Sequence, residues 1–294
     1  MESNPLNFEE RHIAALFNEM ADEYDQLEDE WYPHLFRQIE KIIRIHFSKG
    51  KGLTALDVGC GTGLQTFLLD ALGYETTGID IAAALIERAL LKSQRDDSAP
   101  RFVMASAVNI PFRDNSFDVV SCCGSTLSFI PQYPRALAEM GRVVQKKGHI
   151  ILEVEQRWNL DLMWGFIDSV TGGRLGYEQS LSEAWHDLFA LPKEGIMLNY
   201  PFTRLDEKVE YLPLRCFTLT ELRQASEAVG LKILKIYGVH AITNLFPSTW
   251  LHEPKLPSAV RYLAHVLAWI DDKLKDTFPF DRLGCSMIII LQKI

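Results

Sequence analysis

Three glycines at alternate positions form the stretch of this chain that is best suited to bind a ligand. Residues 55–63 read A-L-D-V-G-C-G-T-G, and an apolar strand pattern runs directly into them. Glycine tolerates positive φ and lets a ligand touch the backbone, where a Cβ would intrude. A helix predicted over 64–72 points its free N–H groups into the same space. The pattern predicts a nucleotide-binding turn formed by Gly59, Cys60, Gly61, Thr62 and Gly63. The crevice above this turn is expected to be free of the chain's own side chains.

A carboxylate ends the next predicted strand, which covers residues 75–79. Asp80 lies 21 residues after Gly59, near the spacing of about 20 at which an acid binds the hydroxyl groups of a ribose. Leu64 stands where the third glycine of G-x-G-x-x-G would fall, so the run differs from the dinucleotide-binding motif. A carboxylate at this place can accept from both the 2′ and the 3′ hydroxyl groups. The same side chain can also cap the helix that begins near Ala82.

Four ordered motifs resemble the class I S-adenosylmethionine-dependent methyltransferases. They are the glycine turn, the G-I-D that ends the next strand, F-V-M-A-S-A-V-N-I-P-F-R-D-N-S-F-D-V-V at 102–120 and E-M-G-R-V-V-Q-K-K-G-H at 139–149. Within that family the chain looks most similar to the branch of the ubiquinone and menaquinone methyltransferases. The resemblance covers residues 50–155. It implies S-adenosylmethionine as the methyl donor and S-adenosylhomocysteine as the product.

The resemblance also implies roles for single residues around the turn. Asp57 would hold the methionine ammonium group, although a carboxylate here can instead tie the glycine turn together. Asp80 would bind the ribose, with Ile81 beside the adenine. Relatives more often carry Asp where Ser106 stands, so a neutral hydroxyl would accept from the adenine amino group in this chain. The other positions implied to line the cofactor are Ala107, Val108 and Cys123.

The segment M-A-D-E-Y-D at 20–25 resembles the A-x-x-Y-D element with which many relatives close a helix over the cofactor. Tyr24 would then touch the methionine carboxylate. The equal alternative is that the ring packs an amphipathic helix onto the sheet.

The acceptor side is less specific. Methyl transfer is an in-line displacement, so the protein mainly positions the acceptor, and a base is needed only for an acceptor that is protonated at neutral pH. The side chains expected at the mouth are Glu153, Tyr177, His186 and His240, and each histidine can equally be packed or solvated. The run S-C-C-G-S-T at 121–126 lacks the N/D-P-P-Y/F tetrapeptide of relatives that methylate amide or base nitrogens. The acceptor is therefore not expected to be a nucleic-acid base.

The alternation of strands and helices predicts an α/β fold. Strands are expected near 54–58, 75–79, 101–104, 117–122, 148–154 and 231–239, with helices between them. The resemblance adds a final antiparallel strand near 285–291, which gives a doubly wound, seven-stranded, mostly parallel Rossmann-like sheet. Four segments follow: an N-terminal helical cap (1–50), the cofactor-binding core (51–155), a helical lid (156–216) and a C-terminal part (217–294) with a helical insertion near 241–283.

Composition limits the partners. The chain has 294 residues and a net charge of −9, which disfavours a nucleic-acid partner, because phosphate binding needs clustered Lys and Arg. Its five cysteines lack C-x-x-C spacing, so neither a disulfide framework nor a metal site is predicted. No apolar run is long enough for stable membrane insertion. We expect a cytoplasmic protein and leave its oligomeric state open.

The sequence therefore predicts methyl transfer from S-adenosylmethionine to oxygen, nitrogen or carbon of a small molecule. One alternative is a methyltransferase for a lipophilic quinone or lipid at a membrane surface, docked through the helix predicted over 256–274. That helix lacks the basic polar face that favours such docking. The other alternative is a regulatory protein that binds the cofactor without turnover.

Overall fold

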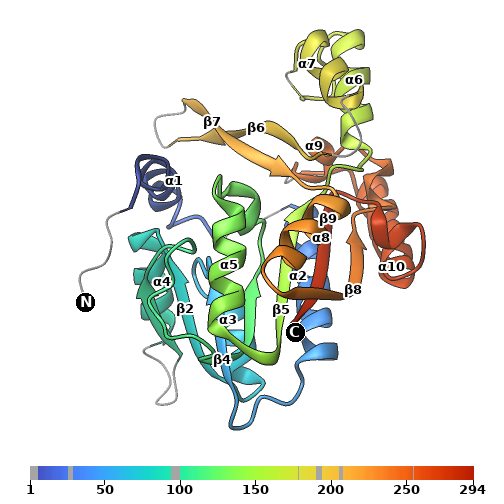
Figure 1. Cartoon of the computed structure of the whole chain (residues 1–294). Coiled ribbons are helices and arrows are strands. Elements are labelled where there is room, and N and C mark those ends of the chain that lie inside the picture. The colour runs from blue at the N-terminus through green and yellow to red at the C-terminus, as the bar shows by residue number, and fades with distance from the viewer. Residues whose placement is uncertain are drawn as a thin grey trace.

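The computed structural model describes residues 6–25, 29–93, 100–177, 179–189, 194–204, 208–253 and 255–294. A seven-stranded sheet forms the centre of the molecule (Figure 1). Its strands are β1 (Thr54–Val58), β2 (Glu75–Asp80), β3 (Arg101–Met104), β4 (Phe117–Cys122), β5 (Val144–Glu155), β8 (Leu231–Val239) and β9 (Ser286–Lys293). They lie in the order β3-β2-β1-β4-β5-β9-β8.

The order and direction of the strands match the predicted fold. Each pair from β3 to β5 is parallel, whereas β9 lies between β5 and β8 and is antiparallel to both. The carboxyl ends of β1, β2, β4 and β5 therefore meet at one edge of the sheet, which is the edge where doubly wound proteins bind their ligands. The prediction of a mostly parallel, Rossmann-like sheet is confirmed.

Helices cover both faces of the sheet because successive strand residues point to opposite sides. Leu56, Val120 and Ile150 pack against α5 and α8, while the neighbouring Ala55 and Val119 pack against α2 and α3. The helices are α1 (Phe8–Glu19), α2 (Trp31–His46), α3 (Leu64–Ala71), α4 (Ala83–Ser93), α5 (Tyr133–Val143), α6 (Asp161–Thr171), α7 (Leu181–Phe189), α8 (Leu219–Ala228), α9 (Ser248–Leu251) and α10 (Ser258–Leu274). Short 3₁₀ turns are η1 (Thr126–Phe129), η2 (Thr243–Leu245) and η3 (Phe280–Arg282).

The two N-terminal helices serve different purposes. The apolar face of α2 is buried against the sheet, so α2 belongs to the core. Only α1 acts as a cap, because its buried side chains pack against the hairpin described below and against Ile81 and Phe129 near the carboxyl edge. A capping box between Asn7 and Glu10 fixes the start of α1.

The insertion after β5 holds an element that the sequence did not predict. Helices α6 and α7 project from the body, and they are followed by an antiparallel hairpin of β6 (Ile196–Thr203) and β7 (Val209–Cys216) that reaches toward α1 (Figure 1). Pro201 in β6 and Pro213 in β7 obscure the strand pattern, since proline weakens a strand prediction. A two-stranded ribbon tolerates them because each strand has a free edge.

Within the described ranges, no helix combines the length and the apolar character that crossing a membrane requires.

Candidate functional site

The glycine turn has the backbone that the sequence predicts. Gly59, Gly61 and Gly63 adopt φ of +69°, +52° and +94°, a region that side chains with a Cβ rarely enter. Asp80 closes the turn, because its carboxylate accepts from the amide of Gly61 at 2.8 Å and from that of Ala82 at 2.9 Å. The two interpretations of Asp80 are therefore compatible: it lies at the turn and also caps the chain ahead of α4.

Asp57 supports the turn from below. Its Oδ2 accepts a hydrogen bond of 2.7 Å from the hydroxyl of Thr66 in the first turn of α3. The side chain is buried, and burial raises its pKa to about 6. This contact corresponds to the structural interpretation, in which Asp57 ties the strand to the helix after the turn. The predicted contact with a methionine ammonium group stays a prediction.

The space above the turn is filled, which corrects the expectation of an open crevice. A Cβ at Gly59 would lie 2.2 Å from Cγ2 of Thr126, and one at Gly61 would lie 3.2 Å from the ring of Tyr24. Gly59 is therefore needed for packing against η1 as well as for its φ. The ring of Tyr24 packs on the backbone of Gly61, and its contact with a methionine carboxylate stays a prediction.

The segment around Tyr24 is held at the turn by polar contacts. Asp25 accepts from the hydroxyl of Thr62 at 2.6 Å and pairs with Lys92 at 2.7 Å. The first turn of α1 lies at the position predicted for the adenine, because the hydroxyl of Ser106 donates a hydrogen bond to Glu10 of this turn. These contacts describe a closed cap, and a ligand at this edge must replace them.

The other predicted cofactor residues differ in their surroundings. Ile81 lies in the apolar cluster between α1 and η1, so a flat ring could replace the side chains that cover it. The amide of Val108 already donates to Ser106 Oγ at 3.1 Å, and the side chain of Ala107 packs toward the core. Cys60 is buried inside the turn. Cys123 is part of the apolar layer beneath α2, away from the cap.

Two of the predicted catalytic residues hold the insertion together or face solvent. The hydroxyl of Tyr177 donates to Asp161 at 2.5 Å, and the amide of Ser248 also donates to Asp161, at 3.0 Å. Tyr177 thus fastens α6 to α9. His186 is exposed on α7, where its nearest polar partner is the adjacent Asp187 at 3.4 Å. Neither contact brings these residues to the glycine turn.

His240 and Glu153 are deeply buried. His240 follows β8 and its ring stacks on Trp31 with 3.7 Å between the centroids. Glu153 lies in β5 beneath the turn after β4, and its Oε2 accepts from the amide of Ser125 at 2.5 Å. Burial raises the pKa of Glu153. Glu153 is therefore near the carboxyl edge and supports the loop after β4, and its catalytic role stays a prediction.

Glu155, which the sequence analysis did not select, lies nearer the carboxyl end of β5 than Glu153. It is the last residue of β5, and it accepts from Ser125 Oγ at 2.7 Å. Burial and the neighbouring charge of Glu153 raise the pKa of Glu155 to about 8. The signal in the sequence is the alternation E-V-E, which puts both acids on one face and the second one nearer the strand end.

The turn after β4 links Glu155 to the glycine turn. Gly124 and Ser125 both have positive φ, +76° and +58°, which is an uncommon conformation for serine. Ser125 binds Glu155 on one side, and on the other side Thr126 packs on Gly59. Non-glycine residues in this region cluster at functional sites, where the surrounding structure holds them.

Beyond Glu155 lie two tyrosines that line a cavity. The hydroxyl groups of Tyr32 and Tyr200 are 2.9 Å apart. Burial raises the pKa of both, and the charge of Glu155 contributes to each increase. The cavity has a volume of about 570 Å³, and its walls are formed by Tyr32, Arg174, Leu175, Gly176, Tyr200, Pro201, Thr249, Trp250, His252 and Glu253. Its aromatic walls suit a ring-bearing molecule.

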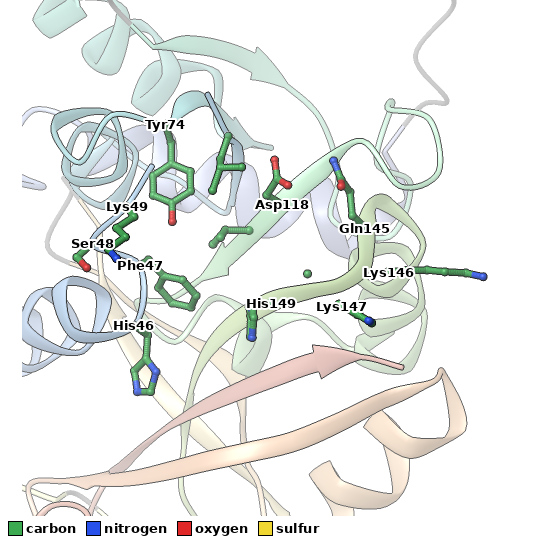
Figure 2. Close-up of a pocket in the computed structure, with 13 residues that line it drawn as sticks. His46, Phe47, Ser48, Lys49, Tyr74, Asp118, Gln145, Lys146, Lys147 and His149 are labelled. Atoms are coloured by element: carbon green, nitrogen blue, oxygen red, sulfur yellow. The ribbon is translucent and has the colours of Figure 1, made fainter. Parts of the chain in front are cut away.

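A second cavity, of about 340 Å³, opens at the opposite edge of the sheet (Figure 2). Leu53 before β1, Asp118 in β4 and Gln145 in β5 line it, so it lies at the amino ends of these strands. Basic side chains surround it, among them Lys49, Lys146 and Lys147. Because it is on the far side of the sheet from the glycine turn, it is separate from the candidate site.

Comparison with known proteins supports the resemblance stated from the motifs. Residues 56–152 match the family model described as a methyltransferase domain. The chain is 36% identical over 140 residues to a 2-phytyl-1,4-naphtoquinone methyltransferase of Nostoc punctiforme. This alignment covers 45% of this chain and 60% of the relative. It is 34% identical over 160 residues to a demethylmenaquinone methyltransferase of Staphylococcus aureus, and this alignment covers 53% of this chain and 65% of the relative. The chain thus matches less than two thirds of the length of either relative.

A solved structure shares the fold over nearly the whole chain. It is a SAM-dependent methyltransferase from Thermotoga maritima, described as a possible histamine N-methyltransferase, with a TM-score of 0.55 and 15% identity. The alignment covers 95% of this chain and 99% of that protein. The predicted family resemblance and the predicted fold are both confirmed.

Proposed function

We propose, starting from the methyltransferase domain that the chain carries over residues 56–152, that the protein transfers a methyl group from S-adenosylmethionine to a small, ring-bearing acceptor. One observation carries the proposal. Continuous contacts lead from Gly59 through Thr126 and Ser125 to Glu155, and the charge of Glu155 reaches the two tyrosines of the larger cavity. A donor at the turn and an acceptor in the cavity would meet beside Ser125 and Glu155.

The side chains at the glycine turn fit the cofactor. S-adenosylmethionine would supply an electrophilic methyl group on a sulfonium centre. Asp80 offers carboxylate oxygens for ribose hydroxyls, and Ser106 offers a hydroxyl for the adenine edge. Asp57 and the bare backbone at Gly61 lie beneath them. Binding requires that Glu10 leave Ser106 and that Tyr24 leave Gly61, so α1 must open as a cap.

Glu155 suits the acceptor's proton chemistry. A base works best when its pKa lies near the working pH, and burial beside Glu153 brings Glu155 to about 8. In this reaction the proton of a ring hydroxyl or carbon acid would go to Glu155. The methyl group would pass from the sulfonium sulfur to the oxygen or carbon left behind, and S-adenosylhomocysteine would leave. The tyrosine pair would orient the ring. The names of the two curated relatives, which are quinone methyltransferases, favour an acceptor of the quinol class.

A membrane-surface version of this function is favoured by the projecting helices. On α6 and α7 the side chains of Val170 and Trp185 are 55% and 56% exposed, and Leu181 is also exposed. An aromatic and aliphatic patch of this kind can rest in the interfacial layer of a bilayer, from which a lipophilic acceptor would enter. Vesicle co-sedimentation of the wild type and of Trp185→Glu tests this. Equal sedimentation of both proteins would reject it.

A cytoplasmic location belongs to the same proposal. All five cysteines are free and buried. Reduced thiols persist in the cytosol, whereas oxidising compartments favour disulfides. Fractionation of the native cells followed by detection of the chain would test the location.

The function is tested by incubating the full chain with S-adenosylmethionine that carries an isotope-labelled methyl group and with a panel of ring hydroxyls, hydroxylated naphthoquinols and amines. Mass spectrometry should find a labelled product from a ring hydroxyl or quinol, and Asp80→Ala should need a higher concentration of S-adenosylmethionine to form it. Calorimetry with S-adenosylhomocysteine runs in parallel. Binding without turnover of any acceptor in a cell extract would favour the regulatory alternative, and binding of NADH in place of S-adenosylhomocysteine would end the proposal.

A further inference from the structure

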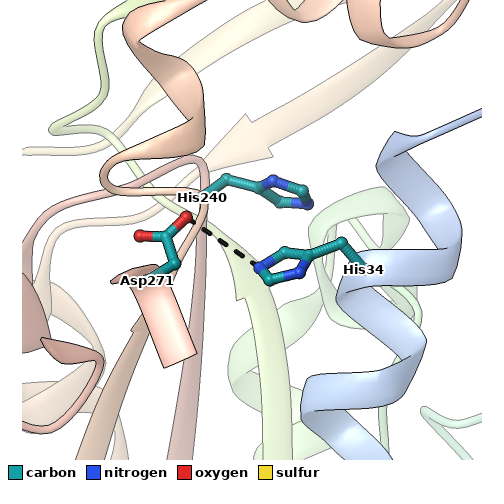
Figure 3. Close-up of side chains that lie close together, drawn as sticks. All are labelled: His34, His240 and Asp271. Carbon is teal, nitrogen blue, oxygen red and sulfur yellow. Dashed lines mark ion pairs between the residues drawn. The ribbon is translucent and has the colours of Figure 1, made fainter. Parts of the chain in front are cut away.

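A group of metal-ligating side chains lies outside the site described above. His34 comes from α2, His240 from the turn after β8 and Asp271 from α10, and the three converge in Figure 3. One ring nitrogen from each imidazole and one carboxylate oxygen all lie within 4.8 Å of one another. The side chains are almost completely shielded, with exposed fractions of 3%, 1% and 3%. Three donor groups from distant parts of the chain therefore meet in a buried space.

Asp271 is the acidic member of the group. Asp271 is buried, and its one ion-pair partner within the described ranges is His34, with 3.9 Å between Nε2 and Oδ2. Buried carboxylates are typically paired with a cation or coordinate a metal ion.

His34 also has a donor atom without a partner. Its Nε2 makes no hydrogen bond to any described part of the chain, and a separation of 3.9 Å from Asp271 is too long for one. A buried polar atom in this state calls for a ligand or a bound water molecule. The atom points toward the carboxylate, as the dashed line in Figure 3 indicates.

The surroundings orient the donors. Asp271 accepts from the amides of Ile242 and Thr243 at 2.7 and 3.1 Å, and from the hydroxyl of Thr243 at 2.8 Å. His240 is fixed by the stack on Trp31 and holds φ of +61°, which is uncommon for a residue with a side chain. Ligands of metal ions are typically held by such outer contacts.

We propose that His34, His240 and Asp271 bind a divalent transition-metal ion, with Zn²⁺ as the best match. Two imidazole nitrogens and one carboxylate oxygen are ligands that zinc accepts, and a hard ion such as Mg²⁺ prefers oxygen alone. Two ligand atoms on tetrahedral zinc lie about 3.4 Å apart, as follows from bonds of about 2.1 Å. The 3.9 Å between His34 and Asp271 therefore closes with a small side-chain movement.

The ion would be structural. It would join α2, the end of β8 and α10, which come from the two ends of the chain. Trp31 stacks on His240, and the next residue, Tyr32, lines the larger cavity. The metal would thus fix one wall of that cavity without touching what binds there. The inference is independent of the proposed methyl transfer.

The test uses the full chain, stripped with a chelator, reloaded with Zn²⁺ and desalted, with metal measured by mass spectrometry and unfolding by calorimetry. The wild type should retain a single equivalent and unfold at a higher temperature than its chelated form. His34→Ala and His240→Asn should lose zinc affinity by at least about ten-fold. Asparagine is chosen because it tolerates positive φ. The matched control is His46→Ala, a histidine on the same helix that contacts Tyr237 instead and should behave as the wild type.

Three results would overturn the inference. The wild type could retain no zinc, which would mean that the space holds water alone. His34→Ala and His240→Asn could retain as much zinc as the wild type. A Co²⁺-loaded wild type could show thiolate charge-transfer absorption, which would assign the metal to cysteine. The cobalt spectrum also decides the matter if the variants fail to fold, because nitrogen and oxygen ligands give weak visible bands without that absorption.

Discussion

The cofactor side and the acceptor side of the candidate site are built in different ways. The cofactor side comes from one short stretch, the glycine turn, and from Asp80 on the adjacent strand. In our proposal the acceptor side joins Tyr32 of α2, Glu155 of β5 and Tyr200 of the hairpin, which are far apart in the sequence. A local motif can therefore identify a cofactor, whereas the acceptor depends on which distant segments meet.

The largest effect should arise when the acceptor side loses its base. Glu155→Gln keeps the hydrogen bond from Ser125 but accepts no proton, so kcat should fall by roughly 10²- to 10⁴-fold. Affinity for S-adenosylhomocysteine should stay as in the wild type, as calorimetry would measure. Glu227→Gln, an exposed residue of α8, is the control. A parallel loss of cofactor affinity would remove the distinction between the two sides.

Asp80→Ala should lower the affinity for the cofactor, whereas Glu155→Gln should leave it unchanged. The loss of charge-assisted hydrogen bonds should weaken binding of S-adenosylhomocysteine by about 1.5–3 kcal/mol, or roughly ten- to a hundred-fold. Glu75→Ala, at the exposed start of the same strand, should bind as the wild type. Isothermal titration of both variants decides the matter. Unchanged affinity in Asp80→Ala would contradict the assignment of the carboxylate.

The raised pKa of Glu155 also predicts how stability depends on pH. The carboxyl group loses its proton near pH 4.5 in the unfolded chain and near pH 8 in the folded protein, so the folded state holds more protons between these values. Its contribution to stability therefore falls as the pH rises from about 4.5 to 8 and is constant above. Glu155→Gln has no carboxyl group at this position, so its stability should lack this decrease with pH. Its melting temperature should exceed that of the wild type by a few degrees at pH 9, since about 1 kcal/mol shifts Tm by roughly 2–4 °C, and the difference should vanish at pH 4.

In the wild-type protein kcat/KM should rise with pH and reach a plateau above about pH 8, because a general base acts when it is deprotonated. A melting difference that is equal at pH 4 and pH 9 would mean that Glu155 titrates normally.

The smallest effect concerns the cap. Glu10→Gln weakens the contact with Ser106 but keeps the acceptor that the capping box of α1 uses. Because a closed cap competes with the ligand, S-adenosylhomocysteine should bind about two- to five-fold more tightly to this variant. The exposed neighbour Glu9→Gln serves as the control. Weaker binding would mean that Glu10 belongs to the cofactor site and does not cover it.

Much of the fold could be predicted because its signals are local. Apolar runs that end in glycine or aspartate define β1 and β2, and the family motifs extend the sheet as far as β5. The hairpin of β6 and β7 could not be predicted, since Pro201 and Pro213 interrupt strand patterns that only the pairing in space makes regular. The segment bounds proposed from the sequence stay a prediction.

In the candidate site, too, the local part could be predicted and the part built from distant residues could not. The sequence placed Gly59, Gly61 and Asp80 together, and the hydrogen bond from Gly61 to Asp80 agrees with this, because two adjacent parallel strands must bring their ends together. Their role in binding a cofactor stays a prediction. His240 was expected at the mouth of the site, but it is buried, and in our proposal it binds a metal ion. Glu155 was missed beside Glu153, since residues two apart on a strand differ only in which is nearer the edge.

The sequence by itself determined the parallel sheet, the glycine turn and its acidic partner, because strand periodicity and positive φ depend on neighbouring residues. The tertiary structure alone decided that Tyr24 and Glu10 cover the turn, that Glu155 binds Ser125 and that His34, His240 and Asp271 meet. These contacts join residues separated by long stretches of chain. Burial and charge, which set their pKa values and their chemistry, come into being only when those stretches pack together.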